Sequence, residues 1–326
     1  MDKISGKSVF VTGGAGFIGS SFSRLLVEQE CNVVVYDNLS SGRIEMIKDL
    51  EAKKNFKFVM ADLLDVQKLE QAMHIAKPDV VIHLAANSDV QNGIKNTRLD
   101  LEQGTIATFN LLDAARKKDV KDILFSSSSV VYGLAKIKPT PEDYGPLKPI
   151  SFYGASKLAS EGLITAFSSL YGMNYYIFRF ANIVGKNLTH GVILDFLRKL
   201  DKNSKKLDVL GNGTQRKSYM DVMDCIGAML FVYKKSGDRE NIYNLSLDDQ
   251  ITVKEIAELA VSEVAPGAKI NYSKENFGWP GDVSDSYISN EKLKKLGFSP
   301  KCKTSREVVL HAIKACKEQI LGNQLL

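Results

Sequence analysis

Cysteine, histidine and tryptophan are scarce in this chain. Its 326 residues include four cysteines, four histidines and one tryptophan. The cysteines form no CxxC pair and show no spacing typical of metal ligands; they are Cys31, Cys225, Cys302 and Cys316. We therefore expect reduced thiols in a cytoplasmic protein, with neither a disulfide framework nor a bound metal.

Long apolar runs are also absent. The longest, at residues 79–86, is far shorter than the ~20 residues that a membrane helix needs. Residues 1–7 contain no apolar stretch before the first apolar segment begins. We therefore expect neither a secretory signal nor a membrane partner.

No block of one charge sign stands out either. The 43 basic and 38 acidic residues leave a net charge of +5, and cationic clusters such as residues 116–118 are short. Solvated helix faces explain clusters of this length, so a nucleic-acid partner is not expected. A mildly basic protein is compatible with an anionic small-molecule substrate.

Strand-like and helix-like segments alternate up to residue 180. Apolar, β-branched segments lie at residues 8–12, 32–37, 57–62, 80–84, 122–126 and 174–179, and helical periodicity marks residues 16–29, 103–118 and 153–171. Such strands with helices between them predict an α/β fold with a doubly wound, Rossmann-type parallel sheet. We expect this domain at residues 1–180 and a smaller α/β lobe at 181–326, with some segments crossing between them.

A glycine-rich turn follows the first predicted strand. Gly13, Gly16 and Gly19 have the spacing GxxGxxG and stand directly before a predicted helix. Without a Cβ atom the backbone can turn tightly and approach a pyrophosphate, whose charge the helix N-terminus stabilises. The second strand ends at Asp37, where a carboxylate accepts hydrogen bonds from an adenosine ribose and repels a 2′-phosphate. The pattern predicts NAD rather than NADP, and Asp62, after the third strand, suits the adenine amino group.

Two later segments point to catalysis: a serine-rich strand end at residues 126–133 and YGASK at 153–157. Tyr153 and Lys157 are four residues apart and so share one face of a helix. A nearby ammonium favours the ionised phenol, which lowers the pKa of the tyrosine. Such a tyrosine can remove a hydroxyl proton while hydride leaves for a nicotinamide. A YxxxK motif alone is weak evidence of catalysis, but together with the dinucleotide motif it indicates oxidation of an alcohol.

These motifs make the chain similar to the extended short-chain dehydrogenase/reductases, the family that includes the NAD-dependent nucleotide-sugar epimerases and dehydratases. Within that family it most resembles 4-epimerases of the UDP-glucose (UDP-galactose) type. The resemblance covers nearly the whole chain: TGGAGFIG at 12–19, DNLSSG at 37–42, ADLLD at 61–65, HLAA at 83–86, SSSSVVYG at 126–133, YGASK at 153–157, RFANIVG at 179–185, residues 207–224, and PGDV at 280–283.

The resemblance implies a role for each part of the site. Ser128, Tyr153 and Lys157 would be the catalytic serine, base and lysine. NAD would contact Tyr153, Lys157, Gly13, Gly16, Phe17, Ile18, Gly19, Asp37, Asn38, Ser40, Gly42, Asp62, Leu63, Leu84, Ala85 and Ala86. The nucleotide-diphosphate sugar would contact Ser128, Tyr153, Asn182, Arg216, Trp279 and Asp282, with Arg216 at the diphosphate. The resemblance also implies a homodimer in which helices 103–118 and 153–171 of two copies form a four-helix bundle.

Departures from the family pattern limit which reactions and substrates are expected. Val130 stands where 4,6-dehydratases and related decarboxylases have a glutamate, so chemistry at C4 is expected instead. Trp279 replaces the usual arginine before Pro-Gly-Asp, which leaves GDP or TDP open beside UDP; it could stack on a base or sugar, or pack in the core. Residues 101–105 replace the usual Asn-Val-x-Gly-Thr, and the loop at 189–192 also differs. Ser286 is small, which is compatible with an N-acetyl group or a larger sugar.

Three functions remain open on this reasoning. The leading one is a 4-epimerase that oxidises C4 of a UDP- or GDP-linked sugar, forms a 4-keto intermediate and returns hydride to the other face. A net C4 dehydrogenase that releases the keto-sugar and leaves NADH needs the same Ser128, Tyr153 and Lys157. The third is a non-catalytic NAD sensor, against which the complete Ser/Tyr/Lys set argues.

Overall fold

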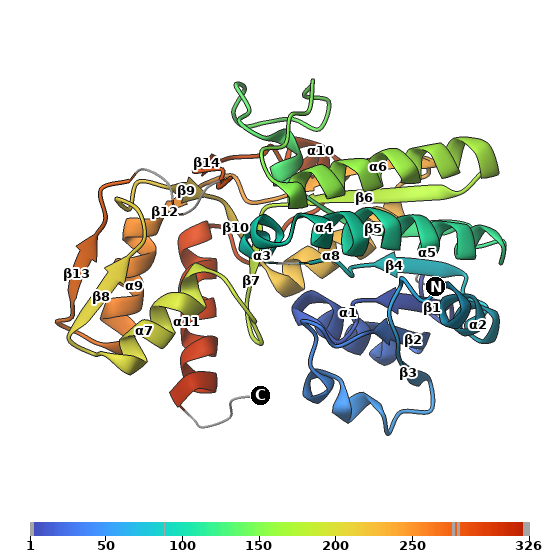
Figure 1. Cartoon of the computed structure of the whole chain (residues 1–326), viewed down its shortest axis with the longest axis horizontal. Helices are drawn as coiled ribbons and strands as arrows, with labels where there is room; N and C mark the ends of the chain where they lie inside the picture. The colour runs from blue at the N-terminus through green and yellow to red at the C-terminus, as the bar shows by residue number, and fades with distance from the viewer. Residues whose placement is uncertain (1–2, 88, 276–277, 279–280, 322–326) are drawn as a thin grey trace.

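A seven-stranded parallel sheet forms the centre of the larger part of the molecule. The computed structural model describes residues 3–87, 89–275, 278 and 281–321 (Figure 1). The strand order is β11-β6-β5-β4-β1-β2-β3, and every pairing is parallel. The strands are β1 (Ser8–Thr12), β2 (Asn32–Asp37), β3 (Phe56–Met60), β4 (Val80–His83), β5 (Asp122–Ser128), β6 (Asn174–Phe180) and β11 (Glu240–Leu245). The predicted doubly wound α/β fold is confirmed.

Helices cover both faces of this sheet because its strands are apolar on both sides. In β1, Val9 and Val11 belong to the core on one face, and Phe10 belongs to the core on the other. This alternation follows from the two-residue period of a strand. The first face carries α1 (Phe17–Glu28) and α8 (Val222–Lys235), and the second carries α2 (Val66–Ala76), α5 (Ala107–Arg116) and α6 (Phe152–Tyr171).

The helix predicted at 103–118 is interrupted at its start. Two short helices, α3 (Val90–Lys95) and α4 (Thr97–Asp100), lead into one π-helical turn at Leu101–Ile106, which continues into α5. Gly104 in that turn lies against α6, since a Cβ atom there would stand 2.6 Å from Ser156 Oγ. A larger residue at 104 would therefore push the turn away from α6.

The smaller part is built from short strands and three helices. Figure 1 shows α7 (Val192–Lys202), α9 (Val253–Val264) and α11 (Ser305–Leu321) together at the left of the molecule. The short strands pair as follows: β7 (Asn182–Val184) with β10 (Tyr219–Asp221), β8 (Lys206–Val209) with β13 (Lys269–Tyr272), and β9 (Arg216–Lys217) with both β12 (Ile251–Thr252) and β14 (Asp285–Ser286).

Part of the later chain returns to the large sheet. β11 pairs with β6 along its whole length, and α10 (Glu291–Leu296) packs against β11 and α8. A division of the chain at residue 180 therefore assigns the outermost strand of this sheet to the second part. Among the described helices, none is long and apolar enough to cross a membrane.

Candidate active site

The candidate site lies where the carboxyl ends of β1, β4 and β5 meet. Strand order reverses between β1 and β4, and in open parallel sheets ligands bind beyond the strand ends at such a point. Thr12, His83 and Ser128 end these three strands or stand beside their ends, so the sheet brings together segments far apart in sequence.

The glycine turn at residues 13–19 is closely packed. Gly13 has φ +68°, and a Cβ atom on it would stand 2.6 Å from the Ala85 amide nitrogen. A Cβ atom on Gly19 would overlap the Gly13 carbonyl oxygen. Gly16 is the N-cap of α1, which has no side-chain cap and no acidic residue in its first turn. The first N–H groups of α1 are thus available to an anion such as a pyrophosphate.

Asp37 joins this turn to the end of β2. Its carboxylate accepts the Ala15 N–H at 3.0 Å on one oxygen and the Leu39 N–H at 2.8 Å on the other. Burial raises the pKa of Asp37, and these two backbone hydrogen bonds oppose the rise. A carboxylate oxygen has two lone pairs, so each can still accept a hydrogen bond from a ribose hydroxyl.

A second acidic residue stands beside Asn38. Asn38 Nδ2 donates to Asp62 Oδ2 at 2.7 Å, and Gln103 Nε2 donates to the same oxygen at 3.2 Å. Two residues predicted to contact the cofactor are therefore neighbours. Gln103 was missed by sequence reasoning, although it lies in the segment at 101–105 that departs from the family pattern.

The other predicted cofactor residues surround these groups. The Ser40 N–H donates to Asn38 Oδ1 at 3.0 Å, and a Cβ atom on Gly42 would stand 2.9 Å from Asp37 Oδ1. The remaining ones lie at the start of α1, after Asp62 or after β4: Phe17, Ile18, Leu63, Leu84, Ala85 and Ala86.

A buried histidine, His83, links the elements next to the site by hydrogen bonds. His83 Nε2 lies 2.9 Å from Thr108 Oγ1, and its Nδ1 lies 2.7 Å from Thr12 Oγ1. The Thr108 hydroxyl donates to the Gly104 carbonyl at 2.6 Å, so Thr108 must accept from His83. Burial, and then the charge of Lys157, lower the pKa of His83 to about 3. His83 is therefore a neutral bridge between β4, β1 and α5.

Ser128 and Tyr153 are neighbours, and Lys157 lies one turn further along the same helix as Tyr153. Ser151 is the N-cap of α6, and its Oγ accepts the Gly154 N–H at 3.1 Å, so Tyr153 lies in the first turn of the helix. The side chains of Tyr153 and Ser128 are hydrogen-bonded. Lys157, one turn further along α6, donates from Nζ to the Ser126 carbonyl at 2.6 Å. Its Nζ lies 5.8 Å from the centre of the Tyr153 ring.

The expected lowering of the tyrosine pKa is not found. Burial raises the pKa of Tyr153 to about 12, the charge of Asp100 adds to the rise, and only the hydrogen bond from Ser128 opposes it. Burial likewise lowers the pKa of Lys157 to about 7, against the charges of Glu161 and Asp100. The prediction was wrong because it counted the ammonium alone: burial and Asp100 raise the pKa of Tyr153, and Lys157 is directed to a backbone carbonyl.

Asp100 is a buried group that sequence reasoning missed. It is the last residue of α4, and its Oδ1 accepts a hydrogen bond from Asn87 Nδ2 at 3.0 Å. Its Oδ2 has no hydrogen-bond partner among the described residues. Burial raises the pKa of Asp100. A carboxylate here acts electrostatically on both Tyr153 and Lys157.

A buried ion pair fixes α6 to the sheet. Arg179 on β6 donates from Nη2 to Glu161 Oε2 at 2.8 Å and from Nε to Oε1 at 3.0 Å. Their side chains are only 4% and 6% exposed. Arg179 Nη1 also donates to the Tyr132 hydroxyl at 2.9 Å, and that hydroxyl donates to Asn244 Oδ1 at 2.8 Å. The pair thus links the helix of Tyr153 to β6, the turn after Ser128 and β11.

Two predicted substrate residues, Asn182 and Arg216, lie on the adjoining small strands, and Asp282 precedes β14. Arg216 Nη2 pairs with Asp285 Oδ2 at 3.0 Å, and Lys138 Nζ pairs with the same oxygen at 2.6 Å. Asp282, whose side chain is 4% exposed, pairs with Lys217 Nζ at 2.7 Å. These partners, Lys138, Lys217 and Asp285, were not predicted.

The small strands also meet the catalytic turn. Ser286 Oγ on β14 lies 3.4 Å from Ser129 Oγ, next to Ser128. Asn182 on β7 donates from Nδ2 to the Ser218 carbonyl at 3.3 Å. Trp279 lies outside the described residues. Arg216 and Ser286 therefore belong to one small sheet that reaches the catalytic serine segment.

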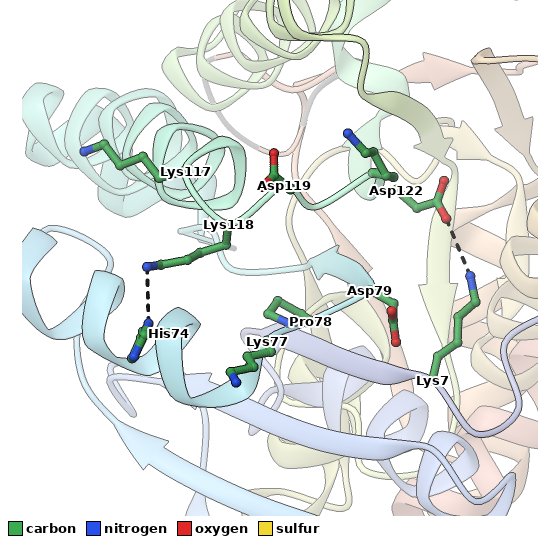
Figure 2. Close-up of a pocket in the computed structure, with 10 residues that line it drawn as sticks. Lys7, His74, Lys77, Pro78, Asp79, Lys117, Lys118, Asp119 and Asp122 are labelled. Atoms are coloured by element: carbon green, nitrogen blue, oxygen red, sulfur yellow. Dashed lines mark hydrogen bonds and ion pairs between the residues drawn. The ribbon is translucent and has the colours of Figure 1, made fainter.

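A cavity of about 550 Å³ lies at the amino ends of the strands of the large sheet. Figure 2 shows Lys7, Asp79 and Asp122, which stand where β1, β4 and β5 begin, and an ion pair of 3.7 Å between Lys7 and Asp122. Because the catalytic residues follow the other ends of these strands, this cavity is separate from the candidate active site.

Comparison with known sequences decides the family. The NAD dependent epimerase/dehydratase family matches residues 9–246, which is most of the chain. The chain belongs to this family. A putative UDP-glucose 4-epimerase of Methanocaldococcus jannaschii is 32% identical over 297 residues, covering 90% of this chain and 93% of that protein.

Solved structures agree with this assignment. The crystal structure of a UDP-galactose 4-epimerase is 36% identical, with a TM-score of 0.85 over 96% of this chain and 99% of that one. The UDP-glucose 4-epimerase of Thermus thermophilus, in complex with NAD, is 27% identical, with a TM-score of 0.84 over 94% and 98%. This epimerase/dehydratase family is NAD-dependent, and its cofactor is NAD.

The residues present fit that cofactor. The glycine turn leaves no room for side chains beside the uncapped start of α1, which suits a pyrophosphate. Asp37 and Asn38 stand at the end of β2, where the ribose of a dinucleotide lies. When bound, NAD supplies the chemistry that side chains lack, which is the acceptance and return of a hydride.

Proposed function

We propose that the protein is a nucleotide-diphosphate-sugar 4-epimerase that acts on a UDP- or GDP-linked sugar. The observation that carries this proposal is the grouping of Ser128, Tyr153 and Lys157 beside the glycine turn of the NAD site. Val130, two residues beyond the catalytic serine, is an apolar residue where elimination of water from C5 and C6 would need an acid or base. Chemistry confined to C4 is therefore favoured over dehydration.

Each residue of the set has a part in the proposed reaction. Tyr153 removes the proton of the C4 hydroxyl as the C4 hydride leaves, which gives a 4-keto sugar. Ser128, hydrogen-bonded to Tyr153, donates to the developing carbonyl oxygen. Lys157, held at the Ser126 carbonyl one turn further along α6, would contact NAD beside Tyr153. After the sugar turns in the site, Tyr153 returns the proton while hydride returns to the other face.

The substrate is held by the small strands next to this set. Arg216 provides the cation for the diphosphate, and its present partner Asp285 would give way to the phosphate oxygens. Asn182, on the strand that follows β6, lies at the sugar end. Ser286, whose Oγ lies 3.4 Å from Ser129 Oγ, is a small residue and so is compatible with a substituent on the sugar. Asp282 is held by Lys217 and shapes the wall rather than donating to the substrate.

The test is a panel of UDP-, GDP- and TDP-sugars incubated with the purified chain without added cofactor and followed by proton NMR. Conversion to the C4 epimer is expected with at least one nucleotide, and that nucleotide identifies the substrate class. A 4-keto product that accumulates with bound NADH would replace the epimerase by a net C4 dehydrogenase. No conversion of any sugar would contradict the proposal.

A single substitution tests the role of the base. Tyr153→Phe removes the proton-accepting oxygen and keeps the ring, so we expect turnover to fall about 10²–10⁴-fold while NAD stays bound. Bound nucleotide is measured after heat release from the protein. Tyr171→Phe, an exposed position on the same helix, is the matched control and should keep full turnover. Equal turnover in the two variants would remove Tyr153 from the mechanism.

We also propose that the protein is a cytoplasmic homodimer. Large apolar side chains are exposed on the π-helical turn, α5 and α6; they include Leu101, Ile106, Phe109, Leu170 and Tyr171. Leu170 is 73% exposed, and water contact of such side chains is unfavourable. A second copy packed on these helices would cover them and would support the helix of Tyr153. The four buried thiols favour a reducing compartment.

A further inference from the structure

Three potential metal ligands meet at the start of α11, far from the proposed active site in sequence. Cys302, Glu307 and His311 each offer one ligand atom, and these atoms all lie within 4.8 Å of one another. Glu307 and His311 are four residues apart on α11, so they lie on one face of it. Cys302 comes from the loop before the helix. Their spacing matches no common metal motif, and only the fold brings the three side chains together.

The separation of two of these atoms suits a tetrahedral zinc ion. Cys302 Sγ lies 3.6 Å from His311 Nδ1. Bonds of about 2.3 Å to sulfur and about 2.0–2.1 Å to nitrogen, at a tetrahedral angle, place sulfur and nitrogen about 3.6 Å apart. Little movement is therefore needed for both atoms to bind one ion.

The loop that carries Cys302 is held in place by other residues. The Lys301 and Cys302 N–H groups donate to the two oxygens of Asp224 at 2.9 and 3.1 Å. Just beyond, the Ser305 hydroxyl donates to Asp249 Oδ1 at 2.7 Å and accepts the Tyr219 N–H at 3.0 Å. Because these anchors do not use the three candidate ligand atoms, the thiol is positioned before any ion arrives.

The charges around the thiol favour a cation. Two carboxylates lie beside Cys302: a Glu307 oxygen is within 4.8 Å of its Sγ, and Asp224 accepts its backbone N–H. Lys303 opposes them, but its ammonium is turned to Ser299 Oγ at 2.8 Å. A divalent ion would be attracted by these carboxylates.

The exposure of the cluster and the types of its donor atoms limit which metal ions it would bind. Cys302 is buried, whereas Glu307 and His311 are exposed, so the cluster is open to solvent on one side. One thiolate, one imidazole and one carboxylate form a donor set of intermediate softness, which suits Zn²⁺ better than Mg²⁺ or Ca²⁺. Three protein ligands leave one tetrahedral position for water.

We infer that Cys302, Glu307 and His311 form a binding site for Zn²⁺ or a similar transition-metal ion. The ion would join the loop at residues 299–304 to α11, which packs against α7, α9 and β10. The site does not depend on the proposed epimerase activity, because it shares no residue with the Ser128, Tyr153 and Lys157 set.

Cobalt titration of the metal-free, full-length chain tests this inference, in buffer with a non-chelating reductant. We expect one equivalent of Co²⁺ to give a near-ultraviolet thiolate-to-cobalt band that one equivalent of Zn²⁺ abolishes. Cys302→Ser should remove the band, and His311→Ala and Glu307→Gln should each weaken cobalt binding at least tenfold. His311 is exposed, so His311→Ala should keep the fold, and Glu307→Gln keeps a side-chain oxygen that can accept the Lys303 N–H; circular dichroism checks both variants.

Matched controls separate this site from adventitious binding. Cys31→Ser changes another buried thiol, and His74→Ala changes an exposed histidine on α2; both should keep the band and its stoichiometry. Absence of the band in the unmodified chain would overturn the inference. So would a band that survives Cys302→Ser, or one lost equally in Cys31→Ser.

Discussion

At the residue scale, the protonation of Tyr153 and Lys157, the proposed catalytic pair, depends on the groups around them as much as on the two residues themselves. Burial raises the pKa of Tyr153 to about 12 and lowers that of Lys157 to about 7, so it opposes the charged form of each. Asp100 raises the pKa of both groups because a negative charge disfavours the phenolate and favours the ammonium. Its position beside the pair therefore helps to determine the pH range of the reaction.

Asp100→Asn removes that negative charge and keeps the size of the side chain. Both pKa values should fall, so the limb of the kcat/KM profile that rises with pH should move to lower pH. Since Tyr153 and Lys157 interact, this limb belongs to the pair rather than to one residue. The measurement is kcat/KM against pH for the variant and the parent. Asp113→Asn, a carboxylate paired with Arg116 on α5, is the control and should leave the profile in place; an unmoved profile in Asp100→Asn would refute this role.

Residues whose role depends on local sequence were predictable, and residues whose role depends on distant partners were not. The glycine turn, Asp37, and Tyr153 with Lys157 follow from spacing along one strand or helix. Asp100 and Lys217 gave no local signal because their partners lie on other segments. The same holds for the pKa of Tyr153, which burial sets and which a helical spacing cannot report.

At the scale of elements, α6 is held to β6 by one buried ion pair, Glu161 with Arg179. The pair also reaches Ser127, whose Oγ donates to Glu161. A helix that carries a catalytic base needs such a fixed position, since small displacements of reacting groups slow a reaction. The cost of holding two charges inside the protein is met by several hydrogen bonds to each.

Glu161→Gln should therefore destabilise the protein strongly. It leaves the Arg179 guanidinium buried without its counter-ion, and breaking a buried pair in this way costs about 3–5 kcal/mol. Urea unfolding at neutral pH measures the loss. Asp49→Asn breaks the surface pair of Asp49 with Arg24 and should cost about 1 kcal/mol or less. Similar losses in the free energy of unfolding in both variants would mean that the buried pair contributes no more to stability than the surface pair.

Long elements were predicted well, and short ones were not. Apolar runs identified the six large-sheet strands up to residue 180, and periodicity identified α1 and α6. Periodicity missed α2, and strands of two or three residues such as β9 and β14 are too short to show any period. These short strands carry Arg216 and Ser286, so the substrate side of the site depended on resemblance rather than on pattern.

At the scale of the whole molecule, apolar side chains gather on α5, α6 and the preceding π-helical turn. Phe109 and Tyr171 are each about half exposed, and both contact the ring of Phe167. An apolar surface of this kind on two neighbouring helices is typical of a protein–protein interface.

Leu170→Glu should convert the proposed dimer to a monomer, because it would bury a carboxylate without a partner in the interface. Light scattering coupled to size-exclusion chromatography measures the mass at micromolar concentration. Met60→Glu is the matched control, since Met60 is similarly exposed at the end of β3 and should not change the mass. A monomer in the unsubstituted protein would refute the proposed assembly.

The pairing of β11 with β6 has a consequence for how the protein is made. During synthesis β6 is complete at residue 180, but its outer neighbour is not finished until residue 245. Until then β6 is an apolar edge strand, and one row of its backbone N–H and C=O groups is unpaired and faces water. Strands of other chains can pair with such an edge. Residues 1–180 therefore cannot complete the large sheet on the ribosome by themselves. A protein truncated at residue 180 would keep this unprotected edge permanently and would be prone to aggregate.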